Sequence, residues 1–391
     1  MRKRQLNDKE IIIFINNKYY VVNKDTLYLI EKFKLNSEIS CLSKEIELSK
    51  HKTIKIYKRL SKEIKNVKYY DNNIELEFPL KIQWNITNRC NLKCKHCYLG
   101  NLNNQQLSSD ELYLIADRLI NSNVIEVGIS GGEALLVEDL PYIVYKLISN
   151  DIKVNIFTNG LFLKKFENKL VSIMKKTPID DLRFSVSIDG LKQTHDMIRG
   201  KGTYDKIMNN LTYIIDRGYL VTTNTVLSEL NCKEVPELYE LLHSMGVYKI
   251  QIANLIDSGR ANKSLKIDSI SKKMFINELQ KVLIKIGNDR KLLFAEIPDG
   301  ECDSDVYWFD KYEKKFLQKE QWKCSAGIGK ATIDYDGTMY CCPFMKKYSL
   351  GNILDKSLSE IWSSKNRYEF LRELAKNNNN SRVCIVAKKR L

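Results

Sequence analysis

Strand-like and helix-like segments alternate along residues 82–254, and this alternation constrains the fold more than any other feature of the sequence. Short runs rich in Ile and Val begin at Ile82 and recur near 124–129, 153–157, 182–188, 220–227 and 248–254. Amphipathic runs separate them, the first from the capping box Ser108-Ser109-Asp110-Glu111 and the others near 139–149, 162–176, 204–216 and 235–245. Strands joined through helices run parallel to one another. Residues 81–260 are therefore predicted to form a partial (β/α)6 barrel of the TIM type, an α/β fold.

The first 80 residues have a different pattern and are predicted to form a separate N-terminal domain. Two apolar runs, 11–15 and 18–22, flank Asn16-Asn17, a residue pair suited to a hairpin turn. Helix-like runs follow from about Asp25, at 38–47 and at 50–65, and a second hairpin is expected at 67–78. A hairpin, three helices and a β-wing together describe a winged-helix domain over residues 1–80.

Beyond the barrel, residues 261–391 lose the alternation. A helix is predicted at about 269–287, and a hairpin turn at Asp336-Gly337 joins two short strands. This region holds five of the ten cysteines: Cys302, Cys324, Cys341, Cys342 and Cys384. It is therefore predicted to be a small cysteine-containing extension of the barrel.

Cysteine usage and hydropathy indicate a protein of a reducing compartment. Seven of the ten cysteines fall in two groups, 90–97 and 302–342, which favours metal binding over a disulfide framework. The apolar run Ile11–Ile15, after the basic N-terminus, is five residues long, too short for the core of a signal peptide. No segment approaches the roughly 18 apolar residues of a membrane span. We therefore expect a cytoplasmic protein with no membrane partner.

The net charge of +15 has two interpretations. Basic proteins that bind nucleic acid gather Lys and Arg into a patch, often with aromatic residues. Here the lysines are spread along the chain among many Asn and Ile residues. This pattern favours a lysine-rich composition without a nucleic-acid partner.

Three cysteines follow the first barrel strand with the spacing C-x3-C-x2-C: Cys90, Cys94 and Cys97. One interpretation is a zinc site with His96 as the fourth ligand, although zinc sites usually offer paired C-x2-C units and four protein ligands. The other is an iron–sulfur cluster held by three thiolates, with one iron left for a ligand from outside the protein. The position of His96 between two cysteines favours the cluster, because its side chain would point away from the metal.

The remaining candidate site residues also stand at the ends of predicted strands. In chain order they are Gly131, Gly132 and Glu133 after the second strand, Asn159 after the third, Ser187 and Arg199 after the fourth, and Asn224 in the fifth. Because the C-terminal ends of the strands meet at one face of such a barrel, these residues are expected around the cysteines. Glycines let the backbone approach a ligand closely. Arg199 can bind a carboxylate through two parallel hydrogen bonds, the alternative being a surface salt bridge.

The order of the motifs resembles that of the radical S-adenosylmethionine (radical SAM) enzymes: C-x3-C-x2-C, then GGE, TNG, and SIDG with a trailing HDxxRG. The resemblance covers residues 82–260. It implies that Cys90, Cys94 and Cys97 hold a 4Fe-4S cluster, with the amino and carboxylate groups of S-adenosylmethionine on the fourth iron. It also implies how S-adenosylmethionine is bound: Gly131, Gly132 and Glu133 receive its amino group, and His96 lies against its adenine. Ser187 contacts the ribose or carboxylate region, and Arg199 binds the carboxylate. Asn159 and Asn224 make further contacts with this cofactor.

The reaction is also implied by the resemblance. An electron delivered through the cluster, from a donor such as flavodoxin or ferredoxin, cleaves S-adenosylmethionine to methionine and a 5′-deoxyadenosyl radical. That radical removes a hydrogen atom from an unactivated carbon. Because the cofactor carries this chemistry, no catalytic acid, base or nucleophile is predicted among the protein residues.

The segment from Cys324 to Cys342 has the spacing C-x12-G-x4-C and resembles the opening of the SPASM extension of peptide-modifying radical SAM enzymes. That extension ends in closely spaced cysteines, of which this chain keeps only Cys384. The resemblance implies one auxiliary iron–sulfur cluster with Cys324, Cys342 and either Cys384 or Cys302 as metal ligands. The alternative is that these cysteines are buried thiols. Cys341, which has no counterpart in the family, is either a substitute ligand or a buried thiol.

The stretch KYYVVNKDTLYLIEKF, residues 18–33, resembles the PqqD-like winged-helix recognition element of enzymes that mature ribosomally made peptides (RiPPs). In that use a leader peptide adds a strand to the exposed edge of the hairpin. Residues 1–80 carry a net charge of +6 from 17 basic and 11 acidic residues, which favours an acidic leader.

The sequence thus favours a radical SAM enzyme that installs a crosslink, a thioether or an epimerised centre in a ribosomally made precursor peptide. Two other functions stay open. The enzyme could act on a small molecule such as a tetrapyrrole, although the N-terminal recognition unit counts against this. Alternatively, residues 1–80 could bind DNA while the cluster senses redox state, as in a regulator. A sensor, however, does not require the GGE and SIDG motifs or Arg199 around its cluster.

Overall fold

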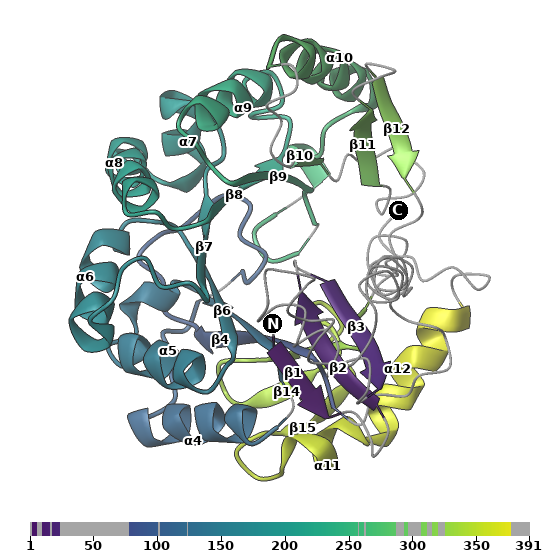
Figure 1. Cartoon of the computed structure of the whole chain (residues 1–391). Helices are drawn as coiled ribbons and strands as arrows, with labels where there is room; N and C mark the ends of the chain where they lie inside the picture. The colour runs from purple at the N-terminus through teal and green to yellow at the C-terminus, as the bar shows by residue number, and fades with distance from the viewer. Residues whose placement is uncertain are drawn as a thin grey trace, which may run out of the picture. The chain divides into compact units, whose positions relative to one another are not determined.

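The computed structural model describes residues 2–5, 10–15, 18–23, 78–100, 102–122, 124–256, 258–261, 263–286, 293–295, 306–310, 315–319 and 325–376. Two compact units make up the chain, Met1–Phe78 and Pro79–Leu391 (Figure 1).

The described part of the first unit is an antiparallel sheet in the order β1-β2-β3. Its strands are β1 Arg2–Gln5, β2 Glu10–Ile15 and β3 Lys18–Asn23. β2 and β3 form the predicted hairpin, closed by the pair Ile15 and Lys18. β1 escapes sequence prediction because its four residues include no apolar one. The helices and second hairpin predicted between residues 25 and 77 lie outside the described residues, so the winged-helix domain stays a prediction.

Six parallel strands form the centre of the second unit, as predicted. They are β4 Lys81–Thr87, β5 Glu126–Gly131, β6 Lys153–Thr158, β7 Leu182–Ser187, β8 Val221–Leu227 and β9 Lys249–Asn254. Each pairs in parallel with the next strand along the chain. The α/β fold is thereby confirmed.

Helices join these strands and form an outer layer around the curved sheet (Figure 1). They are α4 Ser109–Ile120, α5 Leu140–Ser149, α6 Leu163–Met174, α7 Lys192–Arg199, α8 Thr203–Asp216 and α9 Val235–Ser244. The predicted capping box starts α4, where the Ser108 side chain accepts a hydrogen bond from the Glu111 N–H. α7 is not predicted as a helix, because its sequence KQTHDMIR has too few apolar residues to show a helical period.

Alternation along the strands gives the sheet two different faces. Ile82, Trp84 and Ile86 of β4 are buried and join the apolar side chains of the helices in one core. Successive strand residues point to opposite faces, so Ser187 of β7 and Asn224 of β8 lie on the inner face instead. The inner face at the C-terminal ends of the strands is therefore polar, as a site for a charged ligand requires.

The C-terminal region extends this sheet at both edges. Beyond β9 come β10 Leu293–Ala295, β11 Val306–Asp310 and β12 Lys315–Lys319, and beyond β4 come β13 Lys330–Ile333, β14 Thr338–Tyr340 and β15 Ser349–Asn352. β13 and β14 confirm the hairpin predicted at Asp336-Gly337. β13 also pairs in parallel with β4, a contact that no local sequence pattern predicts because the two strands are far apart in the chain.

Helical segments complete the described part of the second unit. They are η1 Ala134–Leu136, η2 Lys263–Leu265, α10 Ser269–Ile286, α11 Leu358–Trp362 and α12 Lys365–Lys376. α10 corresponds to the helix predicted at about 269–287. Among the described residues, no helix combines the length and the apolar character of a membrane span.

Candidate functional site

The three predicted cluster cysteines lie in the loop after β4, residues 88–100, the cysteine loop. Cys94 is buried, whereas Cys90 and Cys97 are half-buried. The described residues contain no group of three or more His, Cys, Asp or Glu side chains arranged to hold a metal ion. His96, the proposed fourth zinc ligand, has its Nε2 atom 2.7 Å from Asp189 Oδ2 instead. This contact with Asp189 argues against His96 as a fourth zinc ligand.

Burial affects the pKa of two of these thiols, Cys90 and Cys94. It raises the pKa of Cys90 to about 11, and the neighbouring Cys94 and Cys97 contribute in the same direction. Burial also raises the pKa of Cys94, with Arg199 opposing the increase. Thiols of this kind become thiolates when a cation binds them and displaces the protons. The Cys97 N–H donates to Cys94 O at 3.3 Å, so these two cysteines lie in one turn of the loop.

Gly131 and Gly132 bring the end of β5 against the backbone of the cysteine loop. The Gly132 N–H donates to Thr87 O at 2.9 Å, and the Glu133 N–H donates to Arg89 O at 2.8 Å. A Cβ atom added at Gly131 would lie 2.3 Å from Thr87 O, and one added at Gly132 would lie 2.2 Å from Arg89 O. Since neither position has room for a side chain, glycine at both lets this segment run beside the chain up to the first cysteine.

The Glu133 carboxylate joins the GGE segment to the end of β6. It accepts hydrogen bonds from Thr158 Oγ1 and the Asn159 N–H, both at 2.7 Å, and from the Leu135 N–H at 3.0 Å. The residue is 1% exposed. Burial raises the pKa of Glu133, and these hydrogen bonds oppose the increase. The carboxylate thus holds two predicted motifs together, while its contact with the amino group of the cofactor stays a prediction.

Asn159 connects the TNG motif to the cysteine loop. Its Nδ2 atom donates to Asn91 Oδ1 at 2.9 Å. Its Oδ1 atom accepts from the Leu161 N–H at 3.1 Å, which fixes the turn that follows β6. The structure therefore brings Asn159 to the predicted site.

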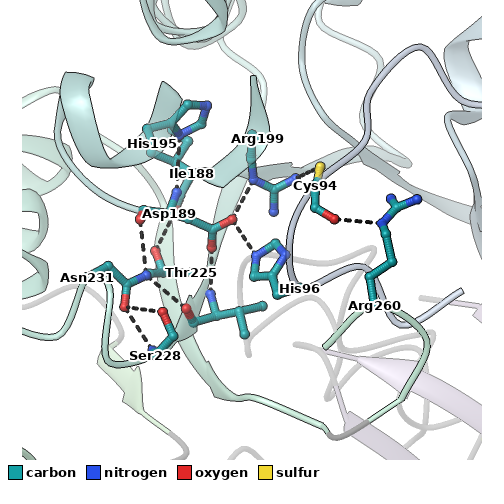
Figure 2. A network of polar contacts seen from close by, with 11 residues as sticks. Cys94, His96, Ile188, Asp189, His195, Arg199, Thr225, Ser228, Asn231 and Arg260 are labelled. Carbon is teal, nitrogen blue, oxygen red and sulfur yellow. Dashed lines mark hydrogen bonds and ion pairs between the residues drawn. The ribbon is translucent and has the colours of Figure 1, made fainter. Parts of the chain in front are cut away.

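Asp189 is the centre of a buried polar network (Figure 2). Its Oδ2 atom accepts a hydrogen bond from Arg199 Nε at 2.5 Å and contacts His96 Nε2 at 2.7 Å, while Oδ1 accepts from the Val226 N–H at 2.8 Å. Burial opposes a charge on this carboxylate, but Arg199 and His96 hold the pKa of Asp189 well below its usual value. One carboxylate thus aligns two of the predicted cofactor-binding side chains.

Arg199 extends from Asp189 to the cysteine loop. Its Nη1 atom lies 3.8 Å from Cys94 Sγ, within hydrogen-bond distance of sulfur. The side chain is only 10% exposed, so the alternative of a surface salt bridge is wrong. The Lys95 N–H also donates to Ile198 O at 2.9 Å, which ties the last turn of α7 to the loop through the backbone.

Ser187 and Asn224 are direct neighbours across β7 and β8. Both are half-buried, and the Ile188 N–H donates to Asn224 O at 3.0 Å. The structure therefore brings these two predicted residues together at the strand ends, and their contacts with the cofactor stay predictions.

A segment after β9, residues 258–261, holds the cysteine loop from another side and is called the strap. Arg260 Nε donates to Cys94 O at 2.9 Å (Figure 2). Arg260 Nη1 donates to Gly100 O at 3.0 Å. Gly259 has φ +64°, and a Cβ atom there would lie 2.4 Å from Cys97 O. The strap is not predictable from sequence, because each of its contacts joins segments far apart in the chain.

The described part of the C-terminal region places its hairpin beside the cysteine loop. The rings of Tyr98 and Phe344 meet edge to face with centroids 5.4 Å apart. Asn85 Nδ2 donates to Asp334 Oδ1 at 3.2 Å, in a buried contact between β4 and the β13–β14 turn. The segment that contains Cys342 therefore packs on the cysteine loop.

The predicted auxiliary ligands are described only in part. Cys341 is 2% exposed and packs in the core, whereas Cys342 is half-buried. Cys302, Cys324 and Cys384 lie outside the described residues. The ligand set of an auxiliary cluster therefore stays a prediction.

Comparison with known families identifies the two cysteine-containing regions. Residues 84–242 match the Radical SAM superfamily, and residues 324–385 match SPASM, an iron–sulfur cluster-binding domain. The chain is a radical SAM superfamily enzyme. Both resemblances predicted from the motifs are confirmed, and the enzyme's cofactors are a 4Fe-4S cluster and S-adenosylmethionine.

The curated relatives of the enzyme include proteins named as synthases and proteins named as maturation proteins. Fe-coproporphyrin III synthase of Methanosarcina barkeri is 27% identical over 303 residues, which cover 72% of this chain and 73% of the relative. The sporulation killing factor maturation protein SkfB of Bacillus subtilis is 25% identical over 299 residues, which cover 75% of this chain and 67% of the relative.

Among solved structures, SuiB of Streptococcus suis bound to S-adenosylmethionine has a TM-score of 0.64 to this enzyme at 17% sequence identity. The match covers 97% of this chain and 94% of SuiB. SuiB bound to its precursor peptide SuiA also matches with a TM-score of 0.64, over 94% of this chain and 88% of that one. At this identity the likeness establishes the fold.

The residues around the cysteine loop fit the two cofactors. His96 Nδ1 is buried and has no hydrogen-bond partner in the described part of the chain, as expected of a ring nitrogen that faces a ligand. Gly132, where a Cβ atom would lie 3.1 Å from Cys90 Cβ, keeps the backbone close to the first cysteine. When bound, the cofactors supply the radical chemistry, and the protein orients them and excludes water.

Sequence analysis missed the residues that hold this site together. Asp189 is part of the quoted SIDG motif, but the motif alone does not show that its carboxylate joins His96 and Arg199. Arg260 had no sequence signal, because it follows the last barrel strand in an irregular segment.

Proposed function

We propose that the enzyme modifies a ribosomally synthesised precursor peptide, by a crosslink, a thioether or an epimerisation, through a 5′-deoxyadenosyl radical. In this proposal residues 1–80 bind the leader, residues 81–260 hold the radical site, and residues 261–391 hold one auxiliary cluster. Flavodoxin or ferredoxin is the class of electron donor.

The extent of the likeness to SuiB carries this proposal. The match with SuiB covers 97% of this chain and therefore includes the N-terminal unit. Sequence alignments with Fe-coproporphyrin III synthase and with SkfB cover 72% and 75% of this chain, so their extent does not separate the two kinds of substrate. An N-terminal unit shared with a protein that binds a precursor peptide supports a peptide substrate.

The roles of the site residues are proposals built on the geometry above. Cys90, Cys94 and Cys97 hold the 4Fe-4S cluster, and the backbone at Gly131 and Gly132 receives the amino group of S-adenosylmethionine. His96 lies against adenine. Ser187, Asn159 and Asn224 line the polar inner face toward the ribose and carboxylate, and Arg199 contributes a positive charge there.

Leader binding is proposed at the edge of the β1-β2-β3 sheet. β2 is the central strand, so β1 and β3 each have one edge without a partner in the described part of this sheet. Backbone N–H and C=O groups along such an edge can pair with an added strand, as in β-augmentation. The net charge of +6 over residues 1–80 supports an acidic leader, whose affinity would fall as salt rises.

The test is an anaerobic reaction of the reconstituted full-length enzyme with short peptides encoded near its gene, followed by mass spectrometry. A crosslink or thioether gives a product that has lost a pair of hydrogens. An epimerised product keeps its mass in ordinary water and gains deuterium in heavy water. The same peptide without its leader is the matched control, and it is expected to react poorly. Equal reaction of both peptides would contradict leader recognition.

A tetrapyrrole substrate is the second candidate, because the curated relatives include Fe-coproporphyrin III synthase at 27% identity. The two candidates differ in a direct assay. If coproporphyrin is consumed with formation of 5′-deoxyadenosine while every candidate peptide is recovered unchanged, the peptide proposal is wrong and this one replaces it.

A further inference from the structure

Asp189 is fixed through all four of its polar atoms. Its carboxylate binds Arg199, His96 and the Val226 N–H, as described above. Its backbone N–H donates to His195 Nδ1 at 3.2 Å, and its backbone oxygen accepts from Asn231 Nδ2 at 3.0 Å (Figure 2). The residue has 0% exposure. A carboxylate held in this way has one available orientation, and it imposes that orientation on its partners.

Arg199 divides its donors between two groups. Nε donates to Asp189 Oδ2, and Nη1 lies 3.8 Å from Cys94 Sγ. Because the guanidinium group is planar and rigid, fixing Nε also fixes the direction of Nη1. Both side chains are almost completely excluded from solvent, at 10% and 0% exposure, so the charge of Arg199 is poorly screened at the sulfur.

A cation beside a cluster ligand affects electron uptake. Reduction by an external low-potential donor adds one electron, and therefore one negative charge, to a 4Fe-4S cluster, and no bond breaks in that step. Positive charge and hydrogen bonds to the cysteine sulfurs stabilise the reduced form and raise the potential.

We propose that Asp189 is a positioning residue that holds the Arg199 guanidinium on the Cys94 sulfur and thereby raises the reduction potential of the radical SAM cluster. This role goes beyond the proposed function and is independent of the substrate, because it concerns the cluster before any substrate reacts.

The test is a potentiometric titration of the reconstituted full-length enzyme, followed by electron paramagnetic resonance without S-adenosylmethionine, with iron content measured in parallel. The variants are Arg199→Gln, Asp189→Asn and the double variant. Arg217→Gln is the matched control, because Arg217 donates to Glu167 at 3.1 Å and not to the cysteine loop. We expect Arg199→Gln to disfavour reduction about tenfold, which is about 59 mV for a one-electron couple. The control should leave the potential unchanged.

The two possible roles of Asp189 predict shifts of opposite sign. If Asp189 positions Arg199, then Asp189→Asn lowers the potential, but the same change in the Arg199→Gln background does not lower it further. If Asp189 acted only through its own charge, Asp189→Asn would raise the potential equally in both backgrounds, and the proposal would be overturned. An unchanged potential in Arg199→Gln would also overturn it.

Arg199→Lys keeps the test decisive if Asp189→Asn does not fold. Lysine retains the positive charge, but its single nitrogen cannot reach Asp189 and Cys94 with the fixed geometry of a guanidinium. A lowered potential at normal iron content is expected. A wild-type potential in this variant would show that position is unimportant and would contradict the proposal.

Discussion

At the residue scale, the site depends on glycines where an added Cβ atom would overlap neighbouring atoms. Gly132 has no room for a side chain, whereas at Gly128, within β5, a Cβ atom would lie 3.1 Å from the edge of the Phe157 ring. A backbone carbonyl cannot move aside without disturbing its loop, but an aromatic side chain can. Replacement by alanine should therefore destabilise the protein more at Gly132 than at Gly128, although the two glycines are only four residues apart.

We predict that Gly132→Ala lowers the free energy of unfolding by about 1–3 kcal/mol and reduces iron loading, because its Cβ atom overlaps Arg89 O beside Cys90. Gly128→Ala is the control and should load iron normally. Urea unfolding and iron analysis of both variants measure this difference. Equal iron loading in the two would show that the close approach at Gly132 is not required.

His195 makes stability depend on pH. Its Nδ1 atom accepts from the Asp189 N–H, which requires a neutral ring, and burial lowers its pKa from 6.5 to about 4. A group with a lowered pKa binds more protons when unfolded, so stability is lost as the pH falls from about 6.5 toward 4. The loss is on the order of 3 kcal/mol. His195→Gln should show a smaller loss in urea unfolding over this range, and an unchanged slope would contradict the assignment.

At the scale of elements, the sequence predicted the strands and helices whose position depends on local patterns. Apart from α7, the bounds of the barrel strands and helices agree with the structure to within a few residues, because each of these elements has its own hydrophobic periodicity. The contacts that complete the site were not predictable in this way. The strap, the β4–β13 pairing and the links from Asp189 to His96 and Val226 join elements that are distant in sequence, and a single sequence contains no local signal for such pairs. The C-terminal ends of the strands were expected to meet, and they do.

The strap offers a prediction at this scale. Arg260→Ala removes two charge-assisted hydrogen bonds to the carbonyls of Cys94 and Gly100, each worth about 1.5–3 kcal/mol, so the cysteine loop should open more often. Iron should then be lost to a chelator faster than from the wild type. Arg118→Ala is the matched control, because Arg118 donates to the carbonyls of Ile353 and Lys356 instead. Equal rates in both variants would show that the strap does not retain the cluster.

At the scale of the whole molecule, one sheet carries both cysteine-containing regions of the second unit. β13 pairs with β4, and Tyr98 meets Phe344, so the SPASM hairpin is fixed next to the cysteine loop. The sequence predicted a small cysteine-containing extension of the barrel but not the pairing of β13 with β4, since that pairing depends on the complete fold.

This arrangement predicts the iron content of the enzyme. With one auxiliary cluster, the reconstituted protein should hold about eight irons, and a variant with Ala at Cys90, Cys94 and Cys97 should keep about half of them. Iron and sulfide analysis measures both values. An iron-free triple variant would mean that the C-terminal cysteines bind no cluster.

The central claim is that Cys90, Cys94 and Cys97 form the site where S-adenosylmethionine is reductively cleaved. The most direct measurement is the formation of 5′-deoxyadenosine by anaerobically reconstituted enzyme with dithionite, compared between the wild type and the triple Ala variant. We predict that the wild type forms 5′-deoxyadenosine and that the triple variant, with its fold intact by circular dichroism, forms none. Formation of 5′-deoxyadenosine by the triple variant at the wild-type rate would contradict the claim.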